Sequence, residues 1–194
     1  MEWTKEDAAF LRDYRHQLDS DDIKLKEEIK QRLLNDKYII HVLDNKELQD
    51  NDAESDDYFG VNILPYFIIP GVQTNTMNYL CYECSAEPRS RWENVTVEKY
   101  QRITFYILCH EKNIIERTTS LARHDLLAAL VMRTFNFAVL SCGRIELISD
   151  LASVTDNNFV TRTMIFSAKT DANLVKTIGG KPRIVNHRTN FSEN

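Results

Sequence analysis

The chain has 194 residues, of which 43% are hydrophobic, and this is enough for one domain of ordinary size with a packed core. Its formal net charge of −5 argues against a general nucleic-acid binder, because such proteins carry an excess of Lys and Arg. No run of about 18 apolar residues occurs and no secretory signal is visible, so we expect synthesis in the cytoplasm and no membrane span.

Two amphipathic helices are predicted at the N-terminal end. The first covers Thr4–Leu18, with Thr4 as its N-cap and acidic residues in its first turn. The segment Asp19–Asp21 breaks that pattern and caps a second helix, which continues to about Leu43 because apolar residues recur there at near-helical spacing.

An acidic segment follows the two helices. Its acidic residues, relieved only by Lys46, are Asp44, Glu47, Asp50, Asp52, Glu54, Asp56 and Asp57. This composition predicts a solvated loop. Within it, Asp50–Asp56 superficially resembles the start of a calcium loop, but Ser55 replaces the turn glycine and Val61 replaces the final glutamate.

An extended arm is predicted between Gly60 and Gly71. It is apolar, but Pro65 and Pro70 exclude a central strand. We expect the arm to pack over an edge of the core or against a neighbouring subunit. A strand is predicted next over Met77–Cys84, followed by a polar connection over Ser85–Val95, which contains Pro88.

The clearest pattern lies between Tyr100 and Lys169, in the order strand, helix, strand, strand. The first strand, Tyr100–Glu111, alternates an apolar face containing Phe105 with a polar face, as a half-buried strand does. A helix is predicted over Leu121–Leu140, capped by Ser120 and ended at Cys142-Gly143. Strands are predicted over Arg144–Asp150 and Phe159–Ala168.

These elements predict an α+β fold, with a mixed or antiparallel sheet of about four strands and a central packed helix. We treat 1–194 as a single domain. Its parts are the N-terminal helices (1–43), the acidic loop and extended arm (44–76), the α+β core (77–175) and the C-terminal tail (176–194). The tail contains Gly179-Gly180 and Pro182, and we expect it to be disordered or held by a partner.

No group of residues is suited to catalysis. Cys81 and Cys84 have the C-x-x-C spacing of zinc and redox sites, but residues three apart on a strand point to opposite faces. The five histidines are scattered, and Lys181 is followed by Pro182 rather than by the Ser or Thr of a phosphate loop. We therefore expect no enzymatic activity, no metal and no cofactor.

The triplet Arg123-His124-Asp125 has two interpretations at this point. One is a solvated first turn, in which Asp125 is favourable near the positive end of the helix dipole. The other is an ion pair between elements or between subunits, in which Arg123 presents its guanidinium to a carboxylate.

Several blocks carry a resemblance to known proteins. The segments His110–Phe135, Gly143–Ser149 and Phe159–Phe166 resemble the tail terminator (tail completion) proteins of tailed bacteriophages. The segments Ile29–Leu43 and Ile63–Pro70 are similar to neck-region proteins of phages that infect Gram-positive hosts. The N-terminal helix and the C-terminal tail lie outside this likeness, and no single motif is diagnostic of it.

The resemblance implies a compact subunit that assembles into a ring, as a hexamer, at the top of the virion tail. Such a ring caps the tail tube, joins it to the head connector or neck proteins, and lets double-stranded DNA pass through its centre. Candidate interface residues are Arg123, Asp125, Pro65, Tyr66, Phe67, Pro70, Lys181 and Arg183. Acidic residues would repel phosphates and let DNA slide, so the candidate channel residues are Asp50, Asp52, Glu54, Asp56 and Asp57.

Two other functions stay open. A head–tail connector or adaptor of the same neck is not separated from a terminator by this sequence. A small cytoplasmic enzyme or a regulatory binding domain would need a pocket with convergent polar groups.

Overall fold

The structure is a computed structural model that describes residues 5–6, 21–51, 53–68, 76–90, 97–154, 158–170, 174–175 and 183–184. The predicted first helix and the C-terminal tail lie outside these ranges, apart from residues 5–6 and 183–184, as do Asp52, Pro70 and Lys181. From residue 21 onward, the helical elements are α2 (Asp21–Leu34), α3 (Lys37–Leu43), α4 (Lys46–Asp50), η1 (Ser55–Tyr58), η3 (Glu111–Asn113) and α5 (Arg123–Phe135). The strands are β1 (Ile63–Leu64), β2 (Tyr79–Ser90), β3 (Val97–His110), β4 (Val139–Leu140), β5 (Gly143–Arg144), β6 (Glu146–Val154), β7 (Phe159–Thr170), β8 (Leu174–Val175) and β9 (Arg183–Ile184).

The fold is α+β, as predicted, and in the described residues its centre is a mixed sheet of five strands in the order β1-β2-β3-β7-β6. β1 runs parallel to β2, and the other neighbouring pairs are antiparallel. β3 pairs with β2 on one side and with β7 on the other, so it is the central strand. β6 pairs with β7 alone among the described strands, and it therefore forms an edge of the sheet.

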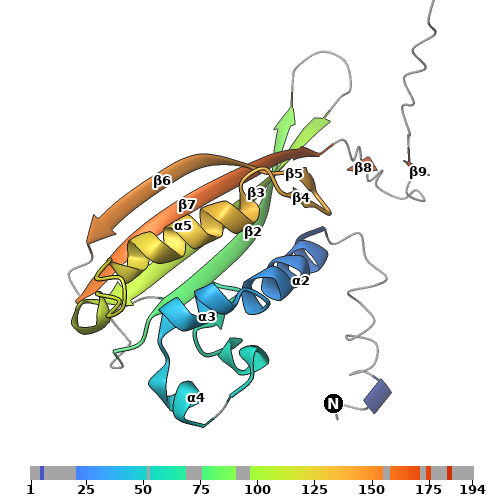
Figure 1. The fold of residues 1–194 in the computed structure, drawn as a ribbon. Helices are drawn as coiled ribbons and strands as arrows, with labels where there is room; N and C mark the ends of the chain where they lie inside the picture. The colour runs from blue at the N-terminus through green and yellow to red at the C-terminus, as the bar shows by residue number, and fades with distance from the viewer. Residues whose placement is uncertain are drawn as a thin grey trace, which may run out of the picture.

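Helices α2, α3 and α5 pack on the same face of the sheet (Figure 1). The predicted alternation of β3 explains this arrangement, because Ile103, Phe105 and Ile107 point to the helix side and are fully buried. The ring of Phe105 lies 4.8 Å from that of Phe135 in α5 and 5.7 Å from that of Phe166 in β7. No helix in the described part of the chain is long and apolar enough to cross a membrane.

Among the described residues, the opposite face of the sheet is covered only near one end. A second apolar cluster lies there, made of Leu64, Tyr79, Cys81, Leu108 and Phe159. Farther along, this face carries half-buried or exposed side chains, among them Thr104, Thr163, Ile165 and Leu151. The sheet therefore has one covered face and one face that is largely open in the described structure.

The prediction of one continuous second helix was wrong, because the chain breaks between α2 and α3. Asp36 has an extended backbone and accepts a hydrogen bond from the backbone N–H of Tyr38 at 3.0 Å, which makes it the N-cap of α3. Its carboxylate also accepts a hydrogen bond from Arg133 of α5 at 2.5 Å. The break is thus fixed by a cap and by a contact with a distant helix.

The acidic segment is more structured than the predicted loop. It contains α4 and η1, with Asn45 capping α4 through a hydrogen bond from Leu48 N–H at 3.3 Å. The arm begins as β1, which adds to the edge of the sheet through Ile63 and Leu64, and continues over the second apolar cluster. Pro65 does not interfere with this strand, because it comes directly after Leu64, where β1 ends.

The predicted polar connection over Ser85–Val95 was also wrong at its start, because β2 continues to Ser90 and includes Pro88. Beyond Cys81, β2 pairs only with β3 among the described strands. A strand with one free side tolerates a proline, since the missing N–H need not bond to a neighbour.

The central helix is shorter than the predicted Leu121–Leu140. Its N-cap is Ala122, rather than Ser120, and Asn136 ends it. Phe137 has φ +63°, and its N–H donates to the carbonyl of Ile145 at 2.9 Å. The backbone beyond the helix therefore pairs in the β4–β5 hairpin, and Gly143, with φ +105°, serves this hairpin instead of ending the helix.

The last two predicted strands are present with shifted bounds. The predicted strand over Arg144–Asp150 divides into β5 and β6, which continues to Val154, and its register shifts between Leu147 and Ser149. The strand predicted from Phe159 is β7. The bulge moves Ile148 out of the regular alternation and leaves it 55% exposed.

Candidate functional site

Arg123 forms an ion pair between elements of the same chain. Its side chain is 3% exposed, and it donates to the carbonyl of Val42 at 3.1 Å and to the carboxylate of Asp44 at 3.0 Å. Asp44 ends α3 with φ +50°, so the pair joins α5 to the end of α3. Of the two interpretations of this residue, the structure shows the ion pair, in its inter-element form, and leaves little of Arg123 exposed to a neighbour.

Asp125 is exposed and forms an ion pair with Arg162 of β7. Arg162 also binds Asp150 of β6 through both carboxylate oxygens, at 2.7 Å each. These hydrogen bonds, which Arg162 donates to Asp150, raise the pKa of the guanidinium above its ordinary value. The three residues link α5, β7 and β6 on the helix side of the sheet.

Sequence reasoning missed Arg162, although a signal was present. Arg162 pairs with Ile107 of β3, so its side chain points to the helix side of the sheet. The next two residues of β7 on that side, Met164 and Phe166, are fully buried. A charge at a core-facing position requires a partner of opposite charge, because burying it alone is costly.

The arm residues lie against the open side of the sheet. The carbonyl of Pro65 accepts a hydrogen bond from Lys26 at 2.9 Å, and the ring of Phe67 lies 4.5 Å from that of Tyr106. Tyr66 is 53% exposed and Phe67 is 42% exposed. This part of the arm therefore packs over its own core and leaves Tyr66 available to another surface.

Four of the candidate channel residues are described, and all four are exposed: Asp50, Glu54, Asp56 and Asp57. Asp57 has a local role, because its carboxylate accepts the backbone N–H of Glu54 at 2.9 Å and so closes the first turn of η1. Of the candidate interface residues in the tail, Arg183 is described only as part of strand β9.

Four large apolar side chains on β6 and on the segment that leads into it are between 55% and 70% exposed: Phe137, Val139, Ile148 and Leu151. Ile148 and Leu151 lie on β6 itself, and we call these two residues the edge surface. The pairing of Phe137 with Ile145 brings the β4–β5 hairpin beside the start of β6. Because β6 is an edge strand, this surface combines apolar side chains with backbone groups that have no strand partner on one side in the described sheet.

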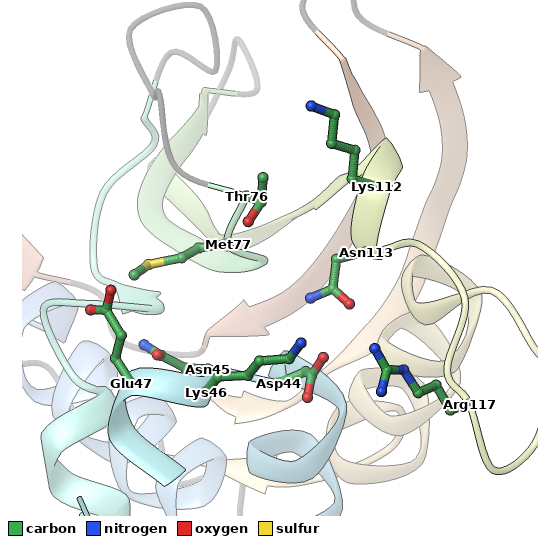
Figure 2. A pocket seen from close by; sticks show the side chains of 9 residues that line it. All are labelled: Asp44, Asn45, Lys46, Glu47, Thr76, Met77, Lys112, Asn113 and Arg117. Atoms are coloured by element: carbon green, nitrogen blue, oxygen red, sulfur yellow. The ribbon is translucent and has the colours of Figure 1, made fainter. Parts of the chain in front are cut away.

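A pocket of about 220 Å³ lies at the end of the molecule where α3 meets α4 (Figure 2). Its lining consists of Asp44, Asn45, Lys46, Glu47, Thr76, Met77, Lys112, Asn113 and Arg117. In Figure 2, Arg117, Asn113 and Lys112 stand on one side and Glu47 and Met77 on the other, with Asp44 and Lys46 below. The sequence did not predict this pocket, because its walls come from three separated segments.

The loop that carries Arg117 is held by the buried carboxylate of Glu116. This carboxylate accepts the hydroxyl of Thr119 at 2.7 Å, and also the backbone N–H groups of Thr119 and Thr118 at 2.6 and 3.0 Å. These hydrogen bonds, that of the Thr119 hydroxyl first, lower the pKa of Glu116 to about 2. A hydrogen bond from the backbone N–H of Arg123 to the carbonyl of Ile114, at 2.7 Å, also closes this loop.

Cys81 and Cys84 point to opposite faces of β2, as the strand spacing predicts. Cys81 belongs to the second apolar cluster, and Cys84 packs against the main core. Burial raises the pKa of both thiols to about 12, so both are protonated at neutral pH. This placement gives the pair no common ligand position.

Comparison with known proteins supplies the family. Among curated proteins, none matches this chain. Among solved structures, a chain from the virion of a native gene transfer agent (GTA) particle is similar, with a TM-score of 0.46 and 14% sequence identity, over 75% of this chain and 93% of that chain. The family model described as YomW matches residues 36–168, which is more than half of the sequence. This protein therefore belongs to the YomW family.

Proposed function

We propose that this chain is a structural protein of a tailed-bacteriophage virion without catalytic activity, and specifically a tail terminator. In this proposal its copies form a closed hexameric ring that caps the tail tube and joins it to the connector. The proposal draws on the resemblance of the segments around α5, β6 and β7 to tail terminator proteins. The structural observation that carries it is the edge surface.

The physical case rests on what an exposed edge strand does. β6 spans nine residues and contains no Lys, Arg or Pro, and its protection from pairing is confined to its first half, where Glu146 and the bulge between Leu147 and Ser149 lie. Ile148 and Leu151 present apolar area that a neighbouring copy would bury. A head-to-tail contact made through one such edge generates a ring if the rotation between copies closes.

The acidic segment supplies the second part of the proposal. Asp50 and Asp56 are exposed and make no side-chain contact among the described interactions, whereas Asp57 is used within η1. We propose that this segment, with Asp52 and Glu54, faces the DNA channel or its rim, where negative charge keeps the duplex from adhering. Changing the five acidic residues to Asn or Gln should then impair DNA retention or ejection, and particles that retain and eject DNA normally would contradict this role.

Native mass spectrometry and electron microscopy of the purified full-length chain test the ring. We expect closed rings from the unchanged protein, and we expect Ile148→Lys combined with Leu151→Lys to leave folded monomers. Leu121→Lys is the matched control, because Leu121 is 53% exposed but lies outside the edge surface. A protein that stays monomeric at high concentration, or rings that tolerate the double substitution, would overturn the proposal.

A second assay separates the terminator from the connector. A terminator should bind the end of purified tails that lack heads and should stop further growth of the tail tube. Binding to DNA-filled heads, without binding to such tails, would instead identify a connector or adaptor.

A further inference from the structure

We propose that the pocket between α4 and η3 is a binding site for an acidic peptide segment of another polypeptide, whose carboxylates contact Lys46, Lys112 and Arg117. This site is distinct from the edge surface, and its occupancy does not depend on ring formation.

Charge is the first reason. Lys46, Lys112 and Arg117 all line the pocket, with Lys112 at its upper side and Arg117 and Lys46 at its lower side in Figure 2. None of the three forms an ion pair with another described residue. Of the two carboxylates in the lining, Asp44 is already bound by Arg123 at 3.0 Å. The other, Glu47, lies across the pocket from Arg117 (Figure 2). Unpaired cations in a concave site of an otherwise acidic protein attract a carboxylate from outside.

The shape and polar lining favour a peptide over a nucleic acid. The cavity of about 220 Å³ admits one or two side chains, whereas a duplex could touch only its rim. The Arg117 fork matches the planar carboxylate of an acidic side chain that enters the cavity, whereas the phosphates of a duplex would stay outside it, next to the carboxylates of Asp44 and Glu47. The Asn113 amide and the Thr76 hydroxyl can bond to a peptide backbone, and Met77 offers an apolar contact.

The site is also preorganised on its cationic side. Arg117 lies on the loop that Glu116 closes. Lys112 lies in η3, immediately after the central strand, and its backbone N–H donates to Nδ1 of His110 at 3.2 Å. Backbone positions fixed in this way reduce the entropy lost when a ligand binds.

Fluorescence anisotropy with the full-length protein tests the site. The probe is a labelled peptide with the sequence of residues 50–57, Asp-Asn-Asp-Ala-Glu-Ser-Asp-Asp, at low ionic strength. We expect saturable binding that Lys112→Ala with Arg117→Ala weakens about tenfold or more, because two charge-assisted contacts are lost. The control double variant Lys24→Ala with Arg144→Ala removes the same charge at exposed positions outside the pocket, and it should bind within about twofold of the unchanged protein.

Three further measurements make the result decisive. Arg117→Lys keeps the positive charge but removes the guanidinium fork, so it should weaken binding less than the double variant does. Circular dichroism verifies that each variant is folded. A peptide in which every acid is changed to Asn or Gln should not bind. The proposal fails if the unchanged protein does not bind the acidic peptide, or if the pocket variant and its control bind it equally. It also fails if inorganic phosphate or a short DNA duplex competes at the pocket more strongly than the peptide, since that would identify a phosphate site.

Discussion

The cations of this protein fall into two groups that the structure treats differently. Arg123 and Arg162 lie on the helix side of the sheet, and each bonds to carboxylates of distant segments of the same chain. Lys112 and Arg117 precede Arg123 in the same stretch of sequence between β3 and α5, yet both are exposed at the pocket and have no ionic partner among the described residues. Charges of the first group hold elements together, and those of the second are available to another molecule.

The largest effect should come from Arg123→Ala. Removing this buried side chain leaves Asp44 and the carbonyl of Val42 without their donors, and loss of one partner of a buried ion pair costs about 3–5 kcal/mol. Urea unfolding followed by circular dichroism measures the change in the free energy of unfolding. A loss below about 1 kcal/mol, which is typical of an exposed pair, would place Arg123 in the second group instead.

Arg162→Ala should have the next largest effect, about 2 kcal/mol, because hydrogen bonds to charged groups contribute about 1.5–3 kcal/mol each but this side chain is partly exposed. Thermal unfolding measures it. Adding Asp150→Asn should recover part of the loss, since the uncompensated carboxylate is then removed. If the double variant loses as much free energy of unfolding as the two single variants lose together, Arg162 and Asp150 contribute independently, and the proposed pairing would be contradicted.

Glu116 should make a smaller contribution that depends on pH. Its folded pKa, about 2, lies below the unfolded value, so its stabilisation is fully present above about pH 4.5 and is lost as the pH falls from there through about 2. We expect Glu116→Gln to reduce the difference in unfolding free energy between pH 7 and pH 3. The same pH dependence in both proteins would show that the carboxylate does not hold the Arg117 loop.

The smallest effect on stability should come from Lys112→Ala and Arg117→Ala. Exposed side chains without partners usually change the free energy of unfolding by less than about 0.5 kcal/mol. Chemical unfolding of each variant verifies this. A larger loss would mean that the pocket cations support the fold, and the contrast between the two groups of cations would then disappear.

The sequence alone was sufficient for the main elements of the core. The alternation around Phe105 predicted the central strand and its buried face, and the periodicity from Leu127 to Phe135 predicted the packed helix, because both patterns are set by local backbone geometry. The opposite directions of Cys81 and Cys84 followed from the same rule.

The tertiary structure decided where the helices and strands begin and end, and which residues contact each other. At the helix break, Asp36 caps α3 locally but is also held by Arg133 of the distant helix α5, and the end of α5 depends on pairing between Phe137 and Ile145. The persistence of β2 through Pro88 depends on its unpaired side. Each of these contacts joins residues through the fold, so no local pattern reports it.

The same division applies to the candidate sites. The sequence left an ion pair of Arg123 open as one of two interpretations, and only the fold shows that the pair forms and that Asp44 is the partner. The pocket gathers residues 44–47, 76–77 and 112–117 at one place, although long stretches of chain separate them. Residue types and local periods are written in the sequence, whereas the convergence of distant side chains follows from how helices and strands pack together.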